Sequence, residues 1–147
     1  MMEEQVAQAT VDPAVREWAA YICRNLTNND LPGQVAAITQ FVRRNVTYVR
    51  DPVGQEYLVA PRQMLTQYSE TGAMLGDCDD HVMLLNGLLQ SVGFDTQCLG
   101  VKHGGASDYN HVISGVKSDR GVVQIDPCQK DGNDKTYADV LFVKSLT

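Results

Sequence analysis

The sequence predicts an α+β domain, in which a central helix that begins at a cysteine packs against an antiparallel β-sheet. Three observations give this prediction: helical periodicity between residues 12 and 45, a capped helix after residue 77, and alternating β-like runs between residues 110 and 127. A chain of 147 residues with 44% hydrophobic content has the size of one domain with one buried core. We therefore expect a single domain over residues 1–147.

The first half of the chain reads as helices that build this core. Residues 1–11 are polar and unpatterned, so we expect a flexible tail there. Asp12-Pro13 is a helix cap with proline at the first helical position, and Asp30 starts a second amphipathic pattern that runs to about Asn45. The segments that follow are a β-like run at 46–49, an irregular stretch over 51–60, a short helix from Pro61, and a connection over 69–75.

The central helix follows Gly76-Asp77-Cys78-Asp79-Asp80-His81. Asp77 is a helix cap, Asp80 completes a carboxylate form of the capping box, and Gly93 ends the helix. Cys78 therefore lies in the first helical turn, where the helix dipole and unpaired amides favour a thiolate. A single cysteine at this place is also compatible with a small core residue.

Two β-like runs after this helix form a predicted hairpin that carries His111 and Asp126. A two-residue loop at 119–120 gives a register in which Asp126 lies opposite Ile113, on the face that His111 shares. A three-residue loop would send the two side chains to opposite faces. The shorter loop makes Cys78, His111 and Asp126 a nucleophile, a base and an orienting carboxylate. Further strands are expected at 94–101 and 140–143, with a glycine-containing loop at 103–107.

The order of these residues resembles the transglutaminase-like superfamily of papain-like cysteine enzymes. Gly76-Asp77-Cys78-Asp79-Asp80 opens the helix, and the upstream residues Phe41 to Tyr48, Asp51-Pro52, Glu56 and Pro61 are similar to bacterial and phage members. The hairpin lacks the tryptophan that many members carry, and Cys128 stands where a hydroxyl residue is common. The resemblance implies a papain-like fold with N-terminal helices, and a cysteine-dependent acyl-transfer reaction.

The oxyanion of such a reaction needs hydrogen-bond donors. The main-chain amide at the helix start, at Asp79, is one candidate. Tyr48 and Gln55 are candidates for the second donor, and Tyr48 resembles the upstream aromatic residue of transglutaminases in sequence order.

His81 lies on the helical face of Cys78 and reads as a polar residue closing the first turn, rather than as a base. A zinc site from Cys78, His81, His111 and Cys128 is chemically feasible, but it lacks the spacing of structural zinc sites. We expect no metal and no cofactor. Cys23, Cys98 and Cys128 are widely spaced and read as buried thiols rather than as disulfides.

We expect a peptidase or amidase that acts on a peptide or protein substrate. The alternative is a catalytically silent binding or assembly module of the same fold, for example in a phage particle. A net charge of −6 argues against a nucleic-acid surface, and no apolar run has the length of a signal peptide or a membrane span. We therefore expect no nucleic-acid or membrane partner and a cytoplasmic location, compatible with association with a virion.

Overall fold

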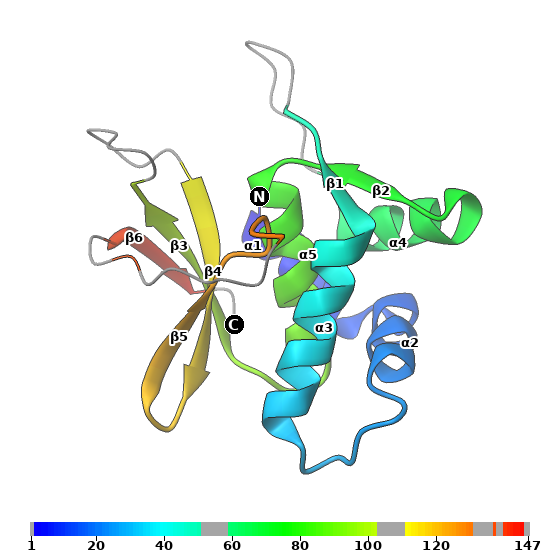
Figure 1. Cartoon of the computed structure of the whole chain (residues 1–147), viewed down its shortest axis with the longest axis horizontal. Helices are drawn as coiled ribbons and strands as arrows, with labels where there is room; N and C mark the ends of the chain where they lie inside the picture. Colours follow the sequence, from blue (N-terminus) through cyan, green and yellow to red (C-terminus); the bar gives the residue numbers. More distant parts are fainter. Residues whose placement is uncertain (1, 51–58, 103–110, 131–136, 138–139, 146–147) are drawn as a thin grey trace.

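The computed structural model describes residues 2–50, 59–102, 111–130, 137 and 140–145 (Figure 1). The elements in chain order are α1 (Met2–Val11), α2 (Pro13–Ile22), α3 (Leu31–Asn45), β1 (Val46–Tyr48), α4 (Pro61–Thr71), β2 (Met74–Gly76), α5 (Cys78–Ser91), β3 (Thr96–Val101), β4 (His111–Ser118), β5 (Gly121–Ile125) and β6 (Val140–Ser145). One sheet has the order β5-β4-β3-β6, with all neighbours antiparallel. The α+β class with an antiparallel sheet is confirmed.

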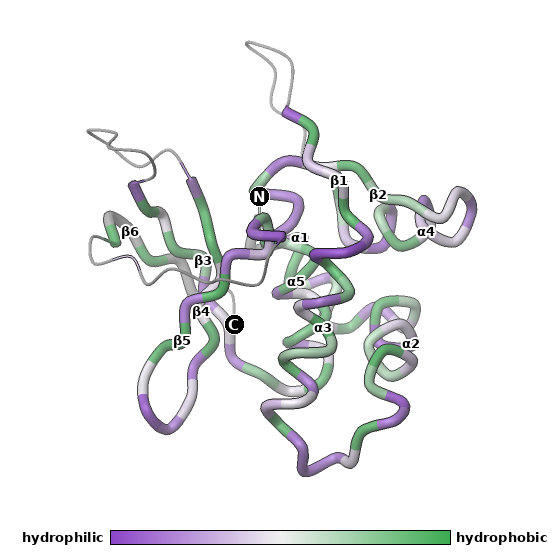
Figure 2. The backbone as a smooth tube through the Cα atoms, viewed as in Figure 1, coloured by the Kyte–Doolittle hydropathy of each residue, from purple (hydrophilic) through white to green (hydrophobic). Residues whose placement is uncertain are grey.

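Helix α5 is the centre of the fold. It packs against the four-stranded sheet and is in contact with the other four helices (Figure 1). Every residue of α5 from Asp80 to Gln90 is buried. Figure 2 shows apolar stretches along α5 and on the facing strands, whereas the tip of the β4–β5 hairpin is polar. The cysteine at the start of α5 is thus carried by a helix that is buried along most of its length.

The expectation of a flexible tail at residues 1–11 is wrong, because residues 2–11 form α1 and pack on α5. Val6 is 0% and Ala9 is 4% exposed. A Cβ added at Gly87 of α5 would lie 2.9 Å from the Cβ of Ala9, so the two helices are in close contact. Thr10 also donates a hydrogen bond to the Gln90 side chain, at 2.9 Å. Small residues at a close helix contact give a weak apolar pattern, which explains the error.

Val6→Asp should therefore destabilise the protein by about 3 kcal/mol or more, because it places a charge in the apolar contact between α1 and α5. Val11→Asp is the matched control, because Val11 lies on the same helix and is 72% exposed. Urea unfolding followed by circular dichroism measures both variants. Equal unfolding midpoints would show that α1 does not contribute to the core.

The helix caps expected from the sequence are present. The side chain of Asp12 accepts a hydrogen bond from the amide of Ala14 at 2.9 Å, and that of Asp30 accepts one from the amide of Gly33 at 3.0 Å. Gly93, just after α5, has the positive φ of 103° that glycine adopts without strain.

Strands β1 and β2 form a separate two-stranded parallel sheet beside the start of α5. The sequence predicted β1, but β2 was not predicted: residues 69–75 were expected to be a connection without regular structure. The register pairs Tyr48 with Gly76, so the end of β1 lies next to the turn that leads into Cys78. A three-residue parallel strand leaves little pattern in a sequence, because its partner is far away in the chain.

The β4–β5 hairpin has the predicted register. Ser118 pairs with Gly121 across a two-residue loop, and Ser114 pairs with Ile125. Strand β3 joins β4 to β6, and β6 confirms the last strand expected from the sequence. His111 is the first residue of β4, and Asp126 directly follows β5. Both therefore lie at the same end of the hairpin. The expected loop at 103–107 lies outside the described residues.

Candidate active site

Cys78 begins α5, and a reciprocal capping box fixes the helix start around it. The Asp77 side chain accepts a hydrogen bond from the amide of Asp80, and the Asp80 side chain accepts one from the amide of Asp77, both at 3.2 Å. The other oxygen of Asp80 accepts a bond from the amide of Val59, at 3.0 Å. Asp80 is 2% exposed. Both carboxylate oxygens of Asp80 are thus occupied by main-chain amides, one at the helix cap and one in the segment before α4.

Gly76 sits where the chain turns from β2 into this cap. A Cβ at this position would lie 2.6 Å from the Cβ of Asp80, which is closer than side chains tolerate. The glycine is therefore required for space: its missing side chain lets the capping carboxylate of Asp80 fold back.

Gly76→Val should break the capping box and displace Cys78. We expect a loss of stability of about 2–4 kcal/mol and at least tenfold slower alkylation of Cys78. Leu75→Val is the matched control, because it places the same side chain on the neighbouring residue, which is 50% exposed. Thermal unfolding and mass spectrometry of alkylated peptides measure the two effects. A Gly76→Val protein with the stability and reactivity of the parent would contradict this role.

His111 and Asp126 are joined by a short hydrogen bond. Nε2 of His111 lies 2.8 Å from Oδ2 of Asp126, and the two side chains are 14% and 6% exposed. The other carboxylate oxygen accepts a bond from the amide of Cys128 at 3.0 Å. Arg43 donates to the main-chain carbonyl of Asp126 at 3.2 Å. Both the carboxylate and the backbone of Asp126 are therefore held in place.

Cys78 is the second hydrogen-bond partner of His111. Burial lowers the pKa of His111, but hydrogen bonds to Asp126 and Cys78, together with the charges of both, raise it to about 9. The structure thus brings Cys78, His111 and Asp126 next to one another.

Tyr48 lies beside this group and is 47% exposed. Burial is the main cause that raises the pKa of its phenol, and the charge of Cys78 is the next. Its ring centroid is 6.0 Å from that of His81. Tyr48 is therefore near the thiol and open to solvent. Asp79 lies in the first turn of α5, directly after Cys78. Gln55 lies outside the described residues.

His81 lies one helical turn after Cys78 on α5, and its side chain is fully buried. Its Nδ1 lies 2.7 Å from the carbonyl oxygen of Asp77 and its Nε2 lies 3.2 Å from Nζ of Lys130, which also donates to the carbonyl of Val46. Burial is the main cause that lowers the pKa of both His81 and Lys130. The two side chains therefore tie the segment after Asp126 to β1 and to the helix start.

Sequence reasoning missed Lys130, because it lies 49 residues from His81 in a stretch that reads as a polar loop. His81 is more deeply buried than a residue that only closes a helical turn. Within the described residues, no three histidine, cysteine or acidic side chains are grouped so that they could hold a metal ion.

The four cysteines all lie within the described residues, and none of them forms a disulfide. Cys98 is buried, as expected, whereas Cys23 and Cys128 are half-buried. Burial raises the pKa of Cys23. Burial, followed by the charges of Asp126 and Cys78, strongly raises the pKa of Cys128. Neither half-buried thiol has the environment of a nucleophile.

Most of the chain matches a known protein family. The sequence model of the transglutaminase-like superfamily matches residues 16–127. The chain belongs to this superfamily. The match covers α3, the cysteine-bearing helix and the whole β4–β5 hairpin, so it includes the three residues that the structure brings together. No curated protein matches this transglutaminase-like sequence.

Two solved structures share the fold. A putative cysteine protease from Cytophaga hutchinsonii aligns with a TM-score of 0.62 at 14% identity, over 80% of this chain and 39% of that one. A putative protease from Parabacteroides distasonis aligns with a TM-score of 0.60 at 13% identity, over 84% of this chain and 25% of that one. The transglutaminase-like chain thus spans less than half the length of either protein. None of its described helices is long and apolar enough to cross a membrane.

Proposed function

We propose that this transglutaminase-like protein is a cysteine-dependent acyl-transfer enzyme that cleaves peptide or carboxamide bonds. One observation carries the proposal: His111 is hydrogen-bonded both to Asp126, at 2.8 Å, and to Cys78 at the start of α5. A base held between a nucleophile and a buried carboxylate is the arrangement that activates a thiol. The two structural neighbours described as proteases share the fold, and they add to this support.

In the proposed reaction, His111 takes the proton of Cys78 and forms a thiolate–imidazolium pair. The thiolate attacks the carbonyl carbon and forms a C–S bond, while the carbonyl electrons move to oxygen. His111 then returns the proton to the leaving amine as the C–N bond breaks, which leaves a thioester. Asp126 keeps the imidazole in one orientation and stabilises its charged form.

Two donors would stabilise the oxyanion: the main-chain amide of Asp79 and the phenol of Tyr48. The hydroxyl of Tyr48 is protonated at neutral pH, as in any tyrosine with an ordinary or raised pKa, and it can therefore donate. Because Tyr48 is half exposed next to the thiol, water has access to the thioester. We therefore favour hydrolysis over transfer to an amine. In hydrolysis, His111 takes a proton from water while the water oxygen forms a C–O bond to the thioester carbon. The C–S bond then breaks, which restores the thiolate and releases the carboxylic acid.

The test is direct detection of the acyl-enzyme. A panel of peptide and carboxamide substrates is incubated with the protein and quenched in acid, and intact-protein mass spectrometry follows the added acyl group. We expect an adduct on Cys78 that forms with the parent protein and is absent from Cys78→Ser. If no substrate and no peptide-like electrophile modifies Cys78, the binding or assembly module of the same fold becomes the better explanation.

A further inference from the structure

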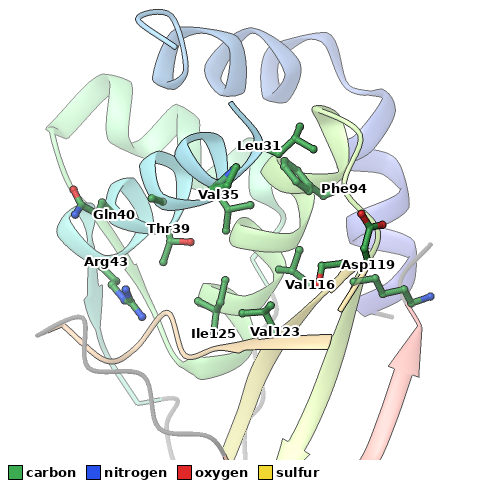
Figure 3. A pocket seen from close by; sticks show the side chains of 14 residues that line it. Leu31, Val35, Thr39, Gln40, Arg43, Phe94, Val116, Asp119, Val123 and Ile125 are labelled. Atoms are coloured by element: carbon green, nitrogen blue, oxygen red, sulfur yellow. The ribbon is translucent and has the colours of Figure 1, made fainter. Parts of the chain in front are cut away.

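A second concave site lies on the side of the molecule formed by α3 and the β4–β5 hairpin. It has a volume of about 620 Å³, within the usual range for small-molecule sites. Its lining is mainly apolar and includes Val35, Phe94, Val123 and Ile125 (Figure 3). Val123 is 52% exposed, although it lies on the face of β5 that continues into the core. We call this site the α3 groove.

The α3 groove contains a buried hydroxyl group. Thr39 is 3% exposed, and its Oγ1 has no hydrogen-bond partner in the part of the chain that the structure describes. Figure 3 shows this oxygen directed toward the middle of the lining side chains. Burying a hydroxyl without a partner costs about 1–3 kcal/mol. A ligand with a polar atom at this place would recover that energy.

Charge is distributed unequally along the groove. Arg43 lies at one end, one helical turn beyond Thr39, and Asp119 lies toward the other end (Figure 3). Leu31 and Arg43 mark the ends along α3, a span of roughly 18 Å at the helical rise. The groove therefore combines an elongated apolar channel with a guanidinium and a hydroxyl at one end.

From these features we infer that the α3 groove binds a small apolar carboxylate. The hydrocarbon body lies between Val35, Phe94 and Val123, and the carboxylate accepts hydrogen bonds from Arg43 and Thr39. This site is separate from the thiol chemistry proposed above. It shares one side chain with that region, because Arg43 also donates to the carbonyl of Asp126.

Decanoate is the probe, and isothermal titration with the full chain measures its dissociation constant. Val123→Asp places a negative charge in the groove and should raise that constant at least tenfold. Val122→Asp is the matched control: the neighbouring residue is 46% exposed, but it faces the opposite side of β5, beside Gly115. It should leave binding within about twofold of the parent.

Thr39→Val keeps the shape of the side chain and removes the hydroxyl. It should weaken decanoate binding about fivefold, the equivalent of one hydrogen bond, without lowering the unfolding midpoint. Decanol, which has the same body without the charge, should bind more weakly than decanoate. The Cys78→Ser protein should bind decanoate like the parent, so that this result is independent of enzymatic activity.

Three results would overturn the inference. The first is the absence of saturable binding up to roughly 1 mM decanoate, the weak end of small-ligand affinity. The second is an equal loss of binding in Val122→Asp and Val123→Asp, which would indicate a general charge effect. The third is decanol binding as tightly as decanoate, which would remove the carboxylate from the recognition.

Discussion

Asp126→Asn should slow acyl-enzyme formation by roughly 10²- to 10⁴-fold while leaving the fold intact. An asparagine keeps the size of the side chain and an oxygen for the amide of Cys128, but it removes the negative charge from Nε2 of His111. The imidazolium then loses a main source of its stability, so the pKa of His111 should fall from about 9 toward its ordinary value. Single-turnover kinetics measure the rate, and NMR titration of His111 measures the pKa.

Asp119→Asn at the tip of the hairpin is the control, because it removes the same charge from the same hairpin, away from His111. It should leave both the rate and the pKa unchanged. A purely structural role for Asp126 predicts a loss of stability without a change in the His111 pKa. Rates within threefold of the parent in Asp126→Asn would reject the orienting role.

Cys78 should be the first of the four thiols to react with limiting iodoacetamide. The thiol of Cys78 is hydrogen-bonded to His111, whose pKa is raised to about 9. Cys78 also lies at the start of helix α5. Burial raises the pKa of Cys23 and of Cys128, and Cys98 is 1% exposed. Peptide mass spectrometry after alkylation from pH 5 to 9 gives the order of reaction.

His111→Ala should move the alkylation profile of Cys78 to higher pH. The variant removes the cation that stabilises the thiolate and leaves the aspartates of the helix start to oppose it. In the parent protein, the pair should lose its imidazolium as the pH rises through about 9, because the folded-state pKa of His111 is raised above 6.5. Faster labelling of another cysteine, or an unchanged profile in His111→Ala, would contradict the ion pair.

The features that could be predicted from the sequence are those set by residues close together in the chain. The hairpin register follows from a loop of two residues at 119–120, and it brings His111 to Asp126. The start of α5 follows from Asp77 and Asp80, which bond each other's backbone amides. In both cases the interacting residues, or the loop that sets the register, could be read directly from the chain.

The features that could not be predicted depend on contacts between distant segments. Helix α1 has a weak apolar pattern, and only its contact with α5 shows which of its residues are buried. The hydrogen bond between Lys130 and His81 joins two segments that are distant in the chain, and the local sequence pattern of neither segment predicts the contact. The same holds for β2, whose parallel partner lies before α4. Tertiary packing, rather than local propensity, decides these three features.

The burial of α5 on every side has a consequence for how the molecule unfolds. The partners of α5 come both from the first 45 residues and from the strands after it, so neither half of the chain encloses a core by itself. Loss of either α1 or β4 exposes part of the same helix to water. The described core should therefore unfold as one cooperative unit. Cys78 and the His111–Asp126 pair should separate only when the whole core unfolds.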